Sequence, residues 1–355
     1  MGLEELRSEI DEVDQQIVDL LNRRARLSQQ VGSAKRQQAG EGQEPEIYLP
    51  HREAQVYAHV DAVNQGPLPR DAVQAIYHEI LSSSRALQRT LRVGYLGPVA
   101  SFAYEAATVH FGRSTNLVPC RTIADVFVEA QRHAVDYGVV PSENSTGGAV
   151  THTLDQFLET DLQICAQIEL PIIQNLLGRG TIDSITRVYS HPQALLQCRR
   201  WLAENLPHAT QIETASTSLA AQMVEDEQTA AIATESAATV YGLKILVPAI
   251  QDAATNVTRF FVIGPQRSAR SGRDRTAIVF TVHDRIGALQ SALQVLANNQ
   301  INLTHIESRP SQRRLWDYVF FADLDGHPDD DGVARALNQL DDVCASVRVL
   351  GAWPA

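Results

Sequence analysis

The sequence of 355 residues lacks most of the features that mark secreted, membrane-bound or nucleic-acid-binding proteins. Its four cysteines, at positions 120, 165, 198 and 344, form no Cys-x-x-Cys pair and no disulfide framework, which favours reduced thiols in protein cores. It has no apolar run of membrane length, and its N-terminus lacks the apolar segment of a signal peptide. A net charge of −12 argues against a general nucleic-acid or membrane-surface role. We therefore expect a cytoplasmic protein that binds neither nucleic acid nor membrane.

The N-terminal segment has the pattern of long helices. Apolar residues recur at steps of three and four from residue 3 to 38, and two further helices are predicted at about 51–64 and 70–88. A helix of 36 residues is about 54 Å long, which is more than a compact monomeric domain can cover. We therefore expect a partner helix, most simply from a second copy of the chain in a homodimer.

Two further segments follow, so the chain is expected to form three domains. Between residues 92 and 264 the β-rich runs RVGYLG, YGVVP, RVYS, AAIAT and TRFFVIG mostly alternate with helical stretches, which predicts open α/β sheets with functional residues at strand ends. After a charged connector, PQRSARSGRDR, the order β-α-β-β-α-β predicts a ferredoxin-like module. The predicted domains are a helical one at 1–90, a two-lobed α/β one at 91–266 and an α+β one at 275–355.

One position breaks the apolar pattern of the first helix. Arg24 stands where the next apolar residue is due, and Lys35, eleven residues later, lies within about 20° on the same face and about 16 Å further along the axis. Because a buried cation without a counter-ion is costly, a bound dianion would explain the pair. A salt bridge from Arg24 to a nearby acid, or a plain coiled coil, is the alternative.

The motifs LRSEID, LLNRRARLSQQVGSAK, IYLPHREAQV and IYHEILSSSRALQ resemble the all-helical chorismate mutase domain. The resemblance implies that cations hold the substrate carboxylates and ether oxygen, that two residues bind its hydroxyl side and that Gln88 faces the ether oxygen. The cations are Arg24, Lys35, Arg52 and Arg7 of a second copy, and the hydroxyl-side residues are Glu53 and Ser84. Conversion of chorismate to prephenate is a unimolecular rearrangement, so it needs confinement and donors to the ether oxygen, for which we assign Lys35 and Gln88, but no nucleophile, metal or cofactor.

The middle segment resembles prephenate dehydratase through six motifs in order: GYLGPVASFAYEAA, VVPSENSTGGAV, SHPQALLQC, STSLAA, AAIATESAATVYGL and NVTRFFVIG. The family fold has two α/β lobes around a cleft, similar to periplasmic binding proteins. We expect Thr258 to donate a hydrogen bond to the leaving hydroxyl of prephenate and Arg259 to anchor a carboxylate. The expected remainder of the pocket is Glu143, Asn144, Ser145, Ser101, Ser216 and Thr217. As alternatives, the last three are helix N-caps and Thr258-Arg259 is a strand-edge pair. Ser142 departs from the family pattern, which usually has an aliphatic residue there.

The C-terminal segment, with GALQSALQVLANNQINLTHIESRP and then DGH, resembles the ACT domain attached to prephenate dehydratases. In that family phenylalanine binds between paired domains. The resemblance places the effector at Gly287, Ala288 and Leu289 together with Asn302, Leu303, Thr304, Glu307, Ser308, Arg309 and Pro310. A dimerisation module without ligand is the alternative.

The whole chain therefore resembles a bifunctional chorismate mutase/prephenate dehydratase that takes chorismate and prephenate as substrates and phenylalanine as a feedback effector. Two alternatives remain from the sequence. In one, the enzyme is a monofunctional dehydratase whose N-terminal helices only dimerise; in the other, the chain is an amino-acid-binding regulator.

Overall fold

The computed structural model describes residues 2–38, 46–253, 255–310 and 318–355, and its contacts divide the chain into two compact units. Unit 1 comprises residues 1–91 and 111–116, and unit 2 comprises residues 92–110 and 117–355. Parts of the predicted N-terminal connector and of the segment LWDYVFF lie outside the described residues. Among the described helices, none is long and apolar enough to cross a bilayer.

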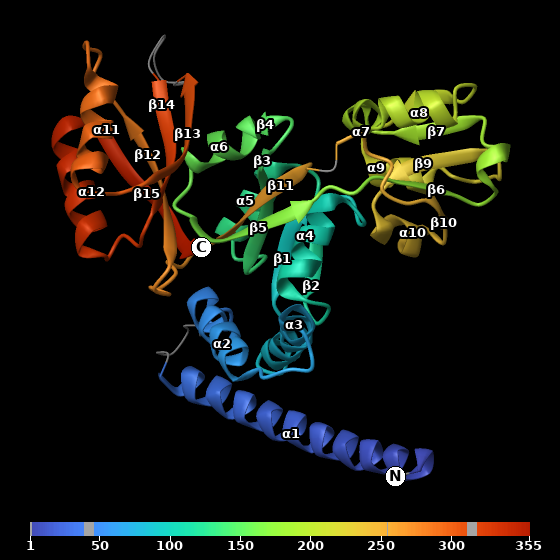
Figure 1. The fold of residues 1–355 in the computed structure, drawn as a ribbon. Coiled ribbons are helices and arrows are strands. Elements are labelled where there is room, and N and C mark those ends of the chain that lie inside the picture. Colours follow the sequence, from blue (N-terminus) through green and yellow to red (C-terminus); the bar gives the residue numbers. More distant parts are fainter. Residues whose placement is uncertain (1, 39–45, 254, 311–317) are drawn as a thin grey trace. The chain divides into compact units, whose positions relative to one another are not determined.

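Unit 1 is built from three helices, α1 (Leu3–Gln38), α2 (Pro50–Val63) and α3 (Arg70–Ala86). The predicted helix 3–38 is confirmed as one unbroken helix, which is drawn in dark blue in Figure 1. Almost all of α1 is exposed in the single chain, including Leu3, Ile10, Leu20 and Leu27, each at least half exposed. Gly32 is its one buried residue, because α3 approaches there: a Cβ at position 32 would lie 2.8 Å from Gln88 Cγ.

The first lobe of unit 2 is an α/β layer around a mixed sheet. Its strands are β1 (Arg92–Leu96), β2 (Asn116–Cys120), β3 (Tyr137–Asn144), β4 (Gly148–Ala149), β5 (Gln163–Pro171) and β11 (Val257–Gly264), and its helices are α4 (Phe102–Phe111), α5 (Ile123–Gln131) and α6 (Thr151–Phe157). The order across the sheet is β5-β11-β3-β1-β2, with β4 on β3. The prediction of an open α/β sheet is confirmed. The sequence reading missed β5, which lies between β11 and β15 (Ser346–Pro354) in the complete sheet.

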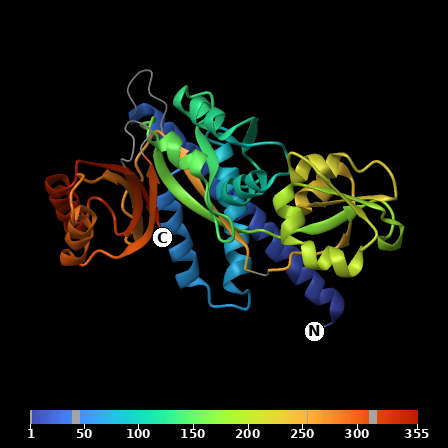
Figure 2. The same ribbon diagram turned by 90° about the horizontal axis from the view of Figure 1, so that it is seen from above.

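The second lobe has a separate sheet in the order β10-β6-β9-β7-β8, seen in yellow and green in Figure 2. Its elements are β6 (Asn175–Gly178), the 3-10 turn η1 (Ile182–Ser184), β7 (Arg187–Ser190), α7 (Pro192–Gln197), α8 (Arg199–Asn205), β8 (Thr210–Glu213), α9 (Thr217–Gln222), β9 (Thr229–Ala233), α10 (Glu235–Tyr241) and β10 (Lys244–Val247). Two chain segments connect the lobes, and they are hydrogen-bonded to each other from Ile172 N to Asn256 O over 2.8 Å. The chain therefore passes between the lobes at one hinge.

The C-terminal module has the predicted β-α-β-β-α-β order: β12 (Asp274–Thr281), α11 (Ala288–Asn298), β13 (Leu303–Pro310), β14 (Tyr318–Asp325), α12 (Asp331–Val343) and β15 (Ser346–Pro354). Its strand order is β13-β14-β12-β15, and α11 and α12 cover one face of this sheet (Figure 1). A finding beyond the sequence is that β15 pairs with β5 at Gly351 and Ile164, so this sheet continues into the first lobe. Phe261 of β11 and Trp353 of β15 share one core, with ring centroids 5.6 Å apart.

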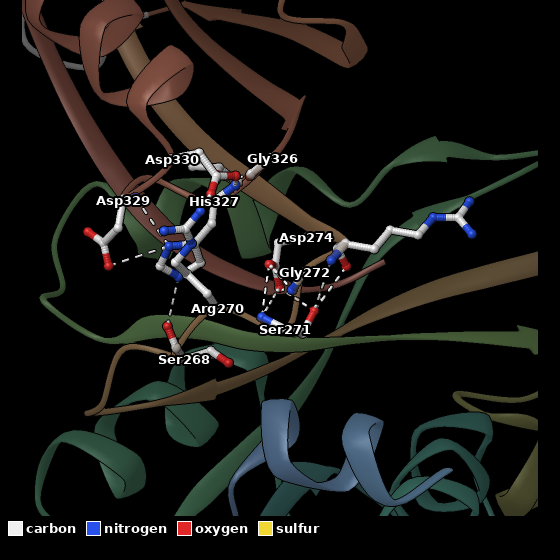
Figure 3. A network of polar contacts seen from close by, with 11 residues as sticks. Ser268, Arg270, Ser271, Gly272, Asp274, Gly326, His327, Asp329 and Asp330 are labelled. Carbon is white, nitrogen blue, oxygen red and sulfur yellow. Dashed lines mark hydrogen bonds and ion pairs between the residues drawn. The ribbon is translucent and has the colours of Figure 1, made fainter. Parts of the chain in front are cut away.

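The charged connector between the first lobe and the module is held by hydrogen bonds (Figure 3). Asp274 accepts hydrogen bonds from the backbone of Ser271 and Gly272, and His327, buried after β14, contacts the carbonyl of Ser268 through Nε2 at 3.0 Å. Arg270 forms an ion pair with Asp330. The DGH segment thus ties the connector to the module and fixes where β12 begins.

The Gly351–Ile164 junction predicts that a methyl group at position 351 destabilises unit 2. Gly351 has a φ of 151°, and a Cβ there would overlap the backbone of Ile164. We expect Gly351→Ala to lower the free energy of unfolding by about 3 kcal/mol. The control Gly242→Ala also replaces a positive-φ glycine but has open space around it, so it should cost only about 1 kcal/mol. Equal costs for the two variants in denaturant unfolding would contradict the close approach.

Candidate active sites and regulatory site

The contact between α1 and α3 brings together predicted residues of the first site. Arg24 Nη1 donates to Ser84 Oγ over 2.6 Å, and Ser84 Oγ in turn donates to the carbonyl of Ile80 over 2.7 Å. Gln88 lies beside Gly32, and its Oε1 is buried with no hydrogen-bond partner among the described residues. Arg24 forms no ion pair with an acid among the residues that the structure describes, so within this part of the chain the salt-bridge alternative is not observed.

Lys35 follows Gly32 by one turn of α1 and is half-buried. Its Nζ donates to the carbonyl of Glu46 over 2.7 Å. Burial lowers the pKa of Lys35, and the Glu46 carboxylate offsets part of that effect. An anion bound beside this ammonium would favour its charged form further.

The remaining predicted cations of unit 1 do not approach Arg24 in the single chain. Arg52 donates to Gln55 over 3.0 Å on the surface of α2. Arg7 is paired with Glu4 at 3.0 Å, and its side chain is 64% exposed. The contribution of Arg7 from a second copy stays a prediction.

Glu53 has a partner that the sequence reading missed. Its carboxylate forms an ion pair with Arg85, whose side chain is only 6% exposed. Arg85 also donates to the carbonyl of Phe111 over 2.7 Å and lies over the ring of Tyr48. Arg85 thus holds one oxygen of Glu53, Oε1, and the predicted contact of Glu53 with the hydroxyl side of the substrate stays a prediction. The sequence did contain a signal for this pair, because Arg85, like Arg24, stands among the apolar residues of a helix.

Unit 2 contains a cleft of about 690 Å³ between its two lobes. Five predicted residues line it: Ser101, Asn144, Ser216, Thr217 and Thr258. Ser101 accepts from Tyr104 N and Ser216 from Leu219 N, so both are also the N-caps that the alternative reading proposed. Ser145 is turned toward the hinge, where it is hydrogen-bonded to Thr255 and Val257, and it does not line the cleft.

Asn144 orients the hydroxyl of Thr258. Its Nδ2 donates to Thr258 Oγ1 over 2.9 Å and to Asn256 Oδ1 over 2.8 Å. Its Oδ1 accepts from the backbone of Thr146 and Gly147, which fixes which end of the amide points at Thr258. Because Thr258 Oγ1 accepts this hydrogen bond, its own proton is left to donate into the cleft.

The structure corrects the position of two predicted residues. Neither Arg259 nor Glu143 lines the cleft; Arg259 Nη1 pairs with Glu143 Oε2 at 2.9 Å, and its Nη2 lies 3.7 Å from Glu169 Oε1. The physical reason is the strand pleat, which points neighbouring residues to opposite faces of a sheet. Thr258 and Asn144 are register partners on the cleft side, and Arg259 and Glu143 are register partners on the other side.

The cleft has a cation that the sequence reading missed. Among its lining residues Arg121 is the one arginine or lysine, and none is a carboxylate. Arg121 is exposed and makes no hydrogen bond or ion pair with a described residue. Arg121 directly follows β2, a strand that the sequence reading did not identify. We expected functional residues at strand ends, but without β2 there was no reason to consider Arg121.

The predicted effector residues divide into two groups. Gly287, Ala288 and Leu289 line a pocket of about 280 Å³ at the start of α11, together with Tyr318 and Phe320 of β14, which were not predicted. The residues on or beside β13 lie elsewhere, and Thr304, Ser308 and Pro310 are on its exposed face. The single chain does not join the two groups in one pocket.

These features define a multidomain enzyme class: a helical domain with internal cations, a two-lobed α/β domain with a cleft and a ferredoxin-like module. Family models match the same three parts, chorismate mutase type II at residues 6–89, prephenate dehydratase at 93–268 and the ACT domain at 276–342. The chain belongs to the family of bifunctional chorismate mutase/prephenate dehydratases.

Two relatives of that name align along almost the entire chain. The protein of Aquifex aeolicus is 44% identical over 99% of this chain and 98% of its own length, and that of Pseudomonas aeruginosa is 42% identical over 99% and 97%. Among solved structures, the prephenate dehydratase of Arthrobacter aurescens in complex with L-Phe is 32% identical with a TM-score of 0.69, covering 75% of this chain and 90% of that one. The chain thus carries both enzymatic domains and an ACT domain.

The buried Glu53–Arg85 pair predicts a structural cost for neutralising Glu53. Glu53→Gln leaves the Arg85 guanidinium without its counter-charge, so we expect the free energy of unfolding of unit 1 to fall by about 3 kcal/mol. Glu79→Gln, at an exposed site on α3, should change it by less than about 0.5 kcal/mol. Thermal or urea unfolding without substrate checks this, and a Glu53→Gln variant as stable as the unaltered protein would show that the pair is not structural.

Proposed function

We propose that the protein converts chorismate to prephenate in unit 1 and prephenate to phenylpyruvate in the cleft of unit 2, with phenylalanine as a feedback effector. The observation that carries the proposal is the Asn144–Thr258 pair in a cleft whose one formal cation is Arg121. Such a site suits a substrate with carboxylates and a leaving hydroxyl. The four cysteines are buried and form no disulfide, which fits a reducing, cytoplasmic setting.

In the mutase reaction the protein supplies confinement and charge. Arg24 holds a carboxylate of chorismate, with Ser84 on the hydroxyl side, so that the substrate is kept in its folded conformer. Lys35 and Gln88 donate to the ether oxygen, on which negative charge gathers as the carbon–oxygen bond breaks. Arg52 adds a further positive charge. The geometry of Lys35 and Gln88 beside Gly32 supports these roles.

In the dehydratase reaction the hydroxyl leaves with the electron pair of its carbon–oxygen bond and becomes water with a proton taken from solvent, while the ring carboxylate departs as carbon dioxide and leaves its electron pair in the aromatic ring. Thr258 donates a hydrogen bond to that hydroxyl, and Asn144 holds Thr258 in the orientation for it. Arg121 takes the carboxylate-anchoring role that the sequence had assigned to Arg259. Ser101, Ser216 and Thr217 supply further donors at the wall of the cleft.

The protein is proposed to act as a homodimer. The exposed apolar residues of α1 form a long stripe that a second copy would cover, and an antiparallel α1 would bring Arg7 toward the Arg24 site of its partner. In the C-terminal module, phenylalanine would bind between paired domains, with Gly287–Leu289 of one and the β13 residues of the other. The relative from Arthrobacter aurescens was solved in complex with L-Phe, which supports phenylalanine as the effector.

The Arg24 assignment predicts a selective loss of mutase activity. Arg24→Ala should lower chorismate turnover at least about 100-fold, because a charged contact to the substrate is lost, and should leave prephenate turnover unchanged. Arg23→Ala, at the exposed neighbouring position, is the control and should keep both activities. The measurement follows chorismate consumption and phenylpyruvate formation with each substrate supplied separately. Unaltered chorismate turnover in Arg24→Ala would mean that the helices only dimerise.

The Arg121 assignment predicts the opposite selectivity. Arg121→Ala should raise KM for prephenate by about 10-fold or more with little change in mutase activity, because a charged hydrogen bond to a carboxylate is removed. Arg132→Ala, exposed at the other end of α5, should leave KM unchanged. Equal KM values for the Arg121 and Arg132 variants would remove Arg121 from the site.

A further inference from the structure

Four charged or titratable side chains meet on the face of the first-lobe sheet that lies opposite the cleft. Glu143 and Arg259 come from strands β3 and β11 of the dehydratase lobe, and His305 and Asp323 come from β13 and β14 of the C-terminal module. His305 Nε2 lies 3.7 Å from Glu143 Oε1, while the other oxygen of Glu143 accepts from Arg259 at 2.9 Å. Each oxygen of Glu143 therefore faces a different domain: Oε2 accepts a hydrogen bond from Arg259, and Oε1 lies within ion-pair distance of His305.

This junction is partly buried: the side chains of Glu143, Arg259 and His305 are 32%, 25% and 23% exposed. The residues above line a cavity of only about 20 Å³, together with apolar side chains such as Phe157 and Phe321. Asp323 is 6% exposed; burial raises the pKa of its carboxyl, and the nearby His305 and Arg259 offset part of that rise. Charges in such surroundings interact more strongly than at a surface, so loss of one partner is felt by the others.

The residues of this junction are direct sequence neighbours of residues that line the cleft. Glu143 precedes Asn144 and Arg259 follows Thr258, and the two pairs are consecutive rungs of the same β3–β11 ladder. The register shifts directly after Arg259, where Ser142 Oγ donates to the Arg259 carbonyl over 3.0 Å. Ser142, which departs from the family pattern, thus satisfies the carbonyl at this irregularity. The backbone that presents Thr258 thus lies one residue away from the side chains that face the C-terminal module.

Strand β13 is attached to the dehydratase lobe at two positions on one face. Besides His305, Arg309 Nη2 contacts both carboxylate oxygens of Asp155 on α6, at 2.8 and 2.9 Å. The other face of the same strand is exposed and carries Thr304 and Ser308, two of the predicted effector residues. A shift of β13 caused by a ligand on its exposed face would move the side chains that hold Glu143.

We propose that His305 is a positioning residue for the dehydratase reaction, which holds Glu143 and Arg259 and thereby fixes the orientation of Asn144 and Thr258 in the cleft. Since β13 also carries predicted effector contacts, this junction connects effector binding to the chemistry. The inference rests on the proposed dehydratase function and adds to it the path of regulation. In this proposal Glu143 and Arg259 act from the face of the sheet opposite the cleft, where they do not touch substrate.

The test compares His305→Ala, His305→Gln and Ile306→Ala in the full-length protein. Ile306 is the neighbour of His305 on the exposed face of β13, so Ile306→Ala is a matched control. We expect His305→Ala to lower kcat for prephenate about 10-fold with KM changed less than about twofold, and to raise the phenylalanine concentration for half-inhibition at least about threefold. His305→Gln, which keeps a donor, should recover most of kcat, and Ile306→Ala should keep it.

Two further readouts separate positioning from general damage. Chorismate turnover should be equal in all variants, and in a Glu143→Gln background the added His305→Ala should change kcat by less than about twofold, because both changes break the same connection. An unchanged kcat in His305→Ala, a parallel loss of mutase activity, or independent effects of the two substitutions would each overturn the proposal. Failure of the proposed function itself would be seen separately, as absence of prephenate turnover in the unaltered protein.

Discussion

The alternation of side chains along two neighbouring strands is the constraint on which the dehydratase domain depends. On β3 and β11 the pair Asn144–Thr258 faces the cleft, and the next pair, Glu143–Arg259, faces the C-terminal module. A shift of either strand that moves the side chains on one face also moves those on the other face, since both sets belong to the same backbone. The chemistry and the contact with the regulatory module are therefore placed back to back on one short segment of sheet.

The proposed ligands of both candidate sites are small anions, and the cations of the protein differ in whether they have an acidic partner within the chain. In unit 1, Arg24 is partly buried on α1 with a neutral hydrogen-bond partner, whereas Arg85 has an acidic partner of its own. Arg24 is suited to hold a ligand, and Arg85 is suited to stabilise the fold. In the cleft of unit 2, Arg121 likewise has no acid among the lining residues. The presence or absence of an internal counter-charge thus distinguishes a binding cation from a structural one.

The sequence was sufficient for the elements with strong patterns and for the family. The helix 3–38 and the order of the C-terminal module could be predicted, because periodicity and local motifs determine them. The candidate residues Arg24 and Ser84, and likewise Asn144 and Thr258, are hydrogen-bonded to each other, and their roles stay predictions. The face on which Arg259 points could not be predicted, because TRFFVIG is buried along most of its length and gives no inside–outside alternation. Arg121 was missed because β2, the strand that it follows, was not identified, and Arg85 was missed because its importance depends on contacts between distant segments. The pairing of β15 with β5 was missed for the same reason.

The most direct test of the account measures how prephenate protects single cysteines placed at two adjacent positions. The four natural cysteines are buried, so a thiol reagent under native conditions reports on the introduced residue. The account predicts that prephenate slows labelling of Thr258→Cys by at least about fivefold, since the substrate occupies the cleft, and leaves labelling of Arg259→Cys unchanged. Equal protection at both positions would contradict the separation of the two faces.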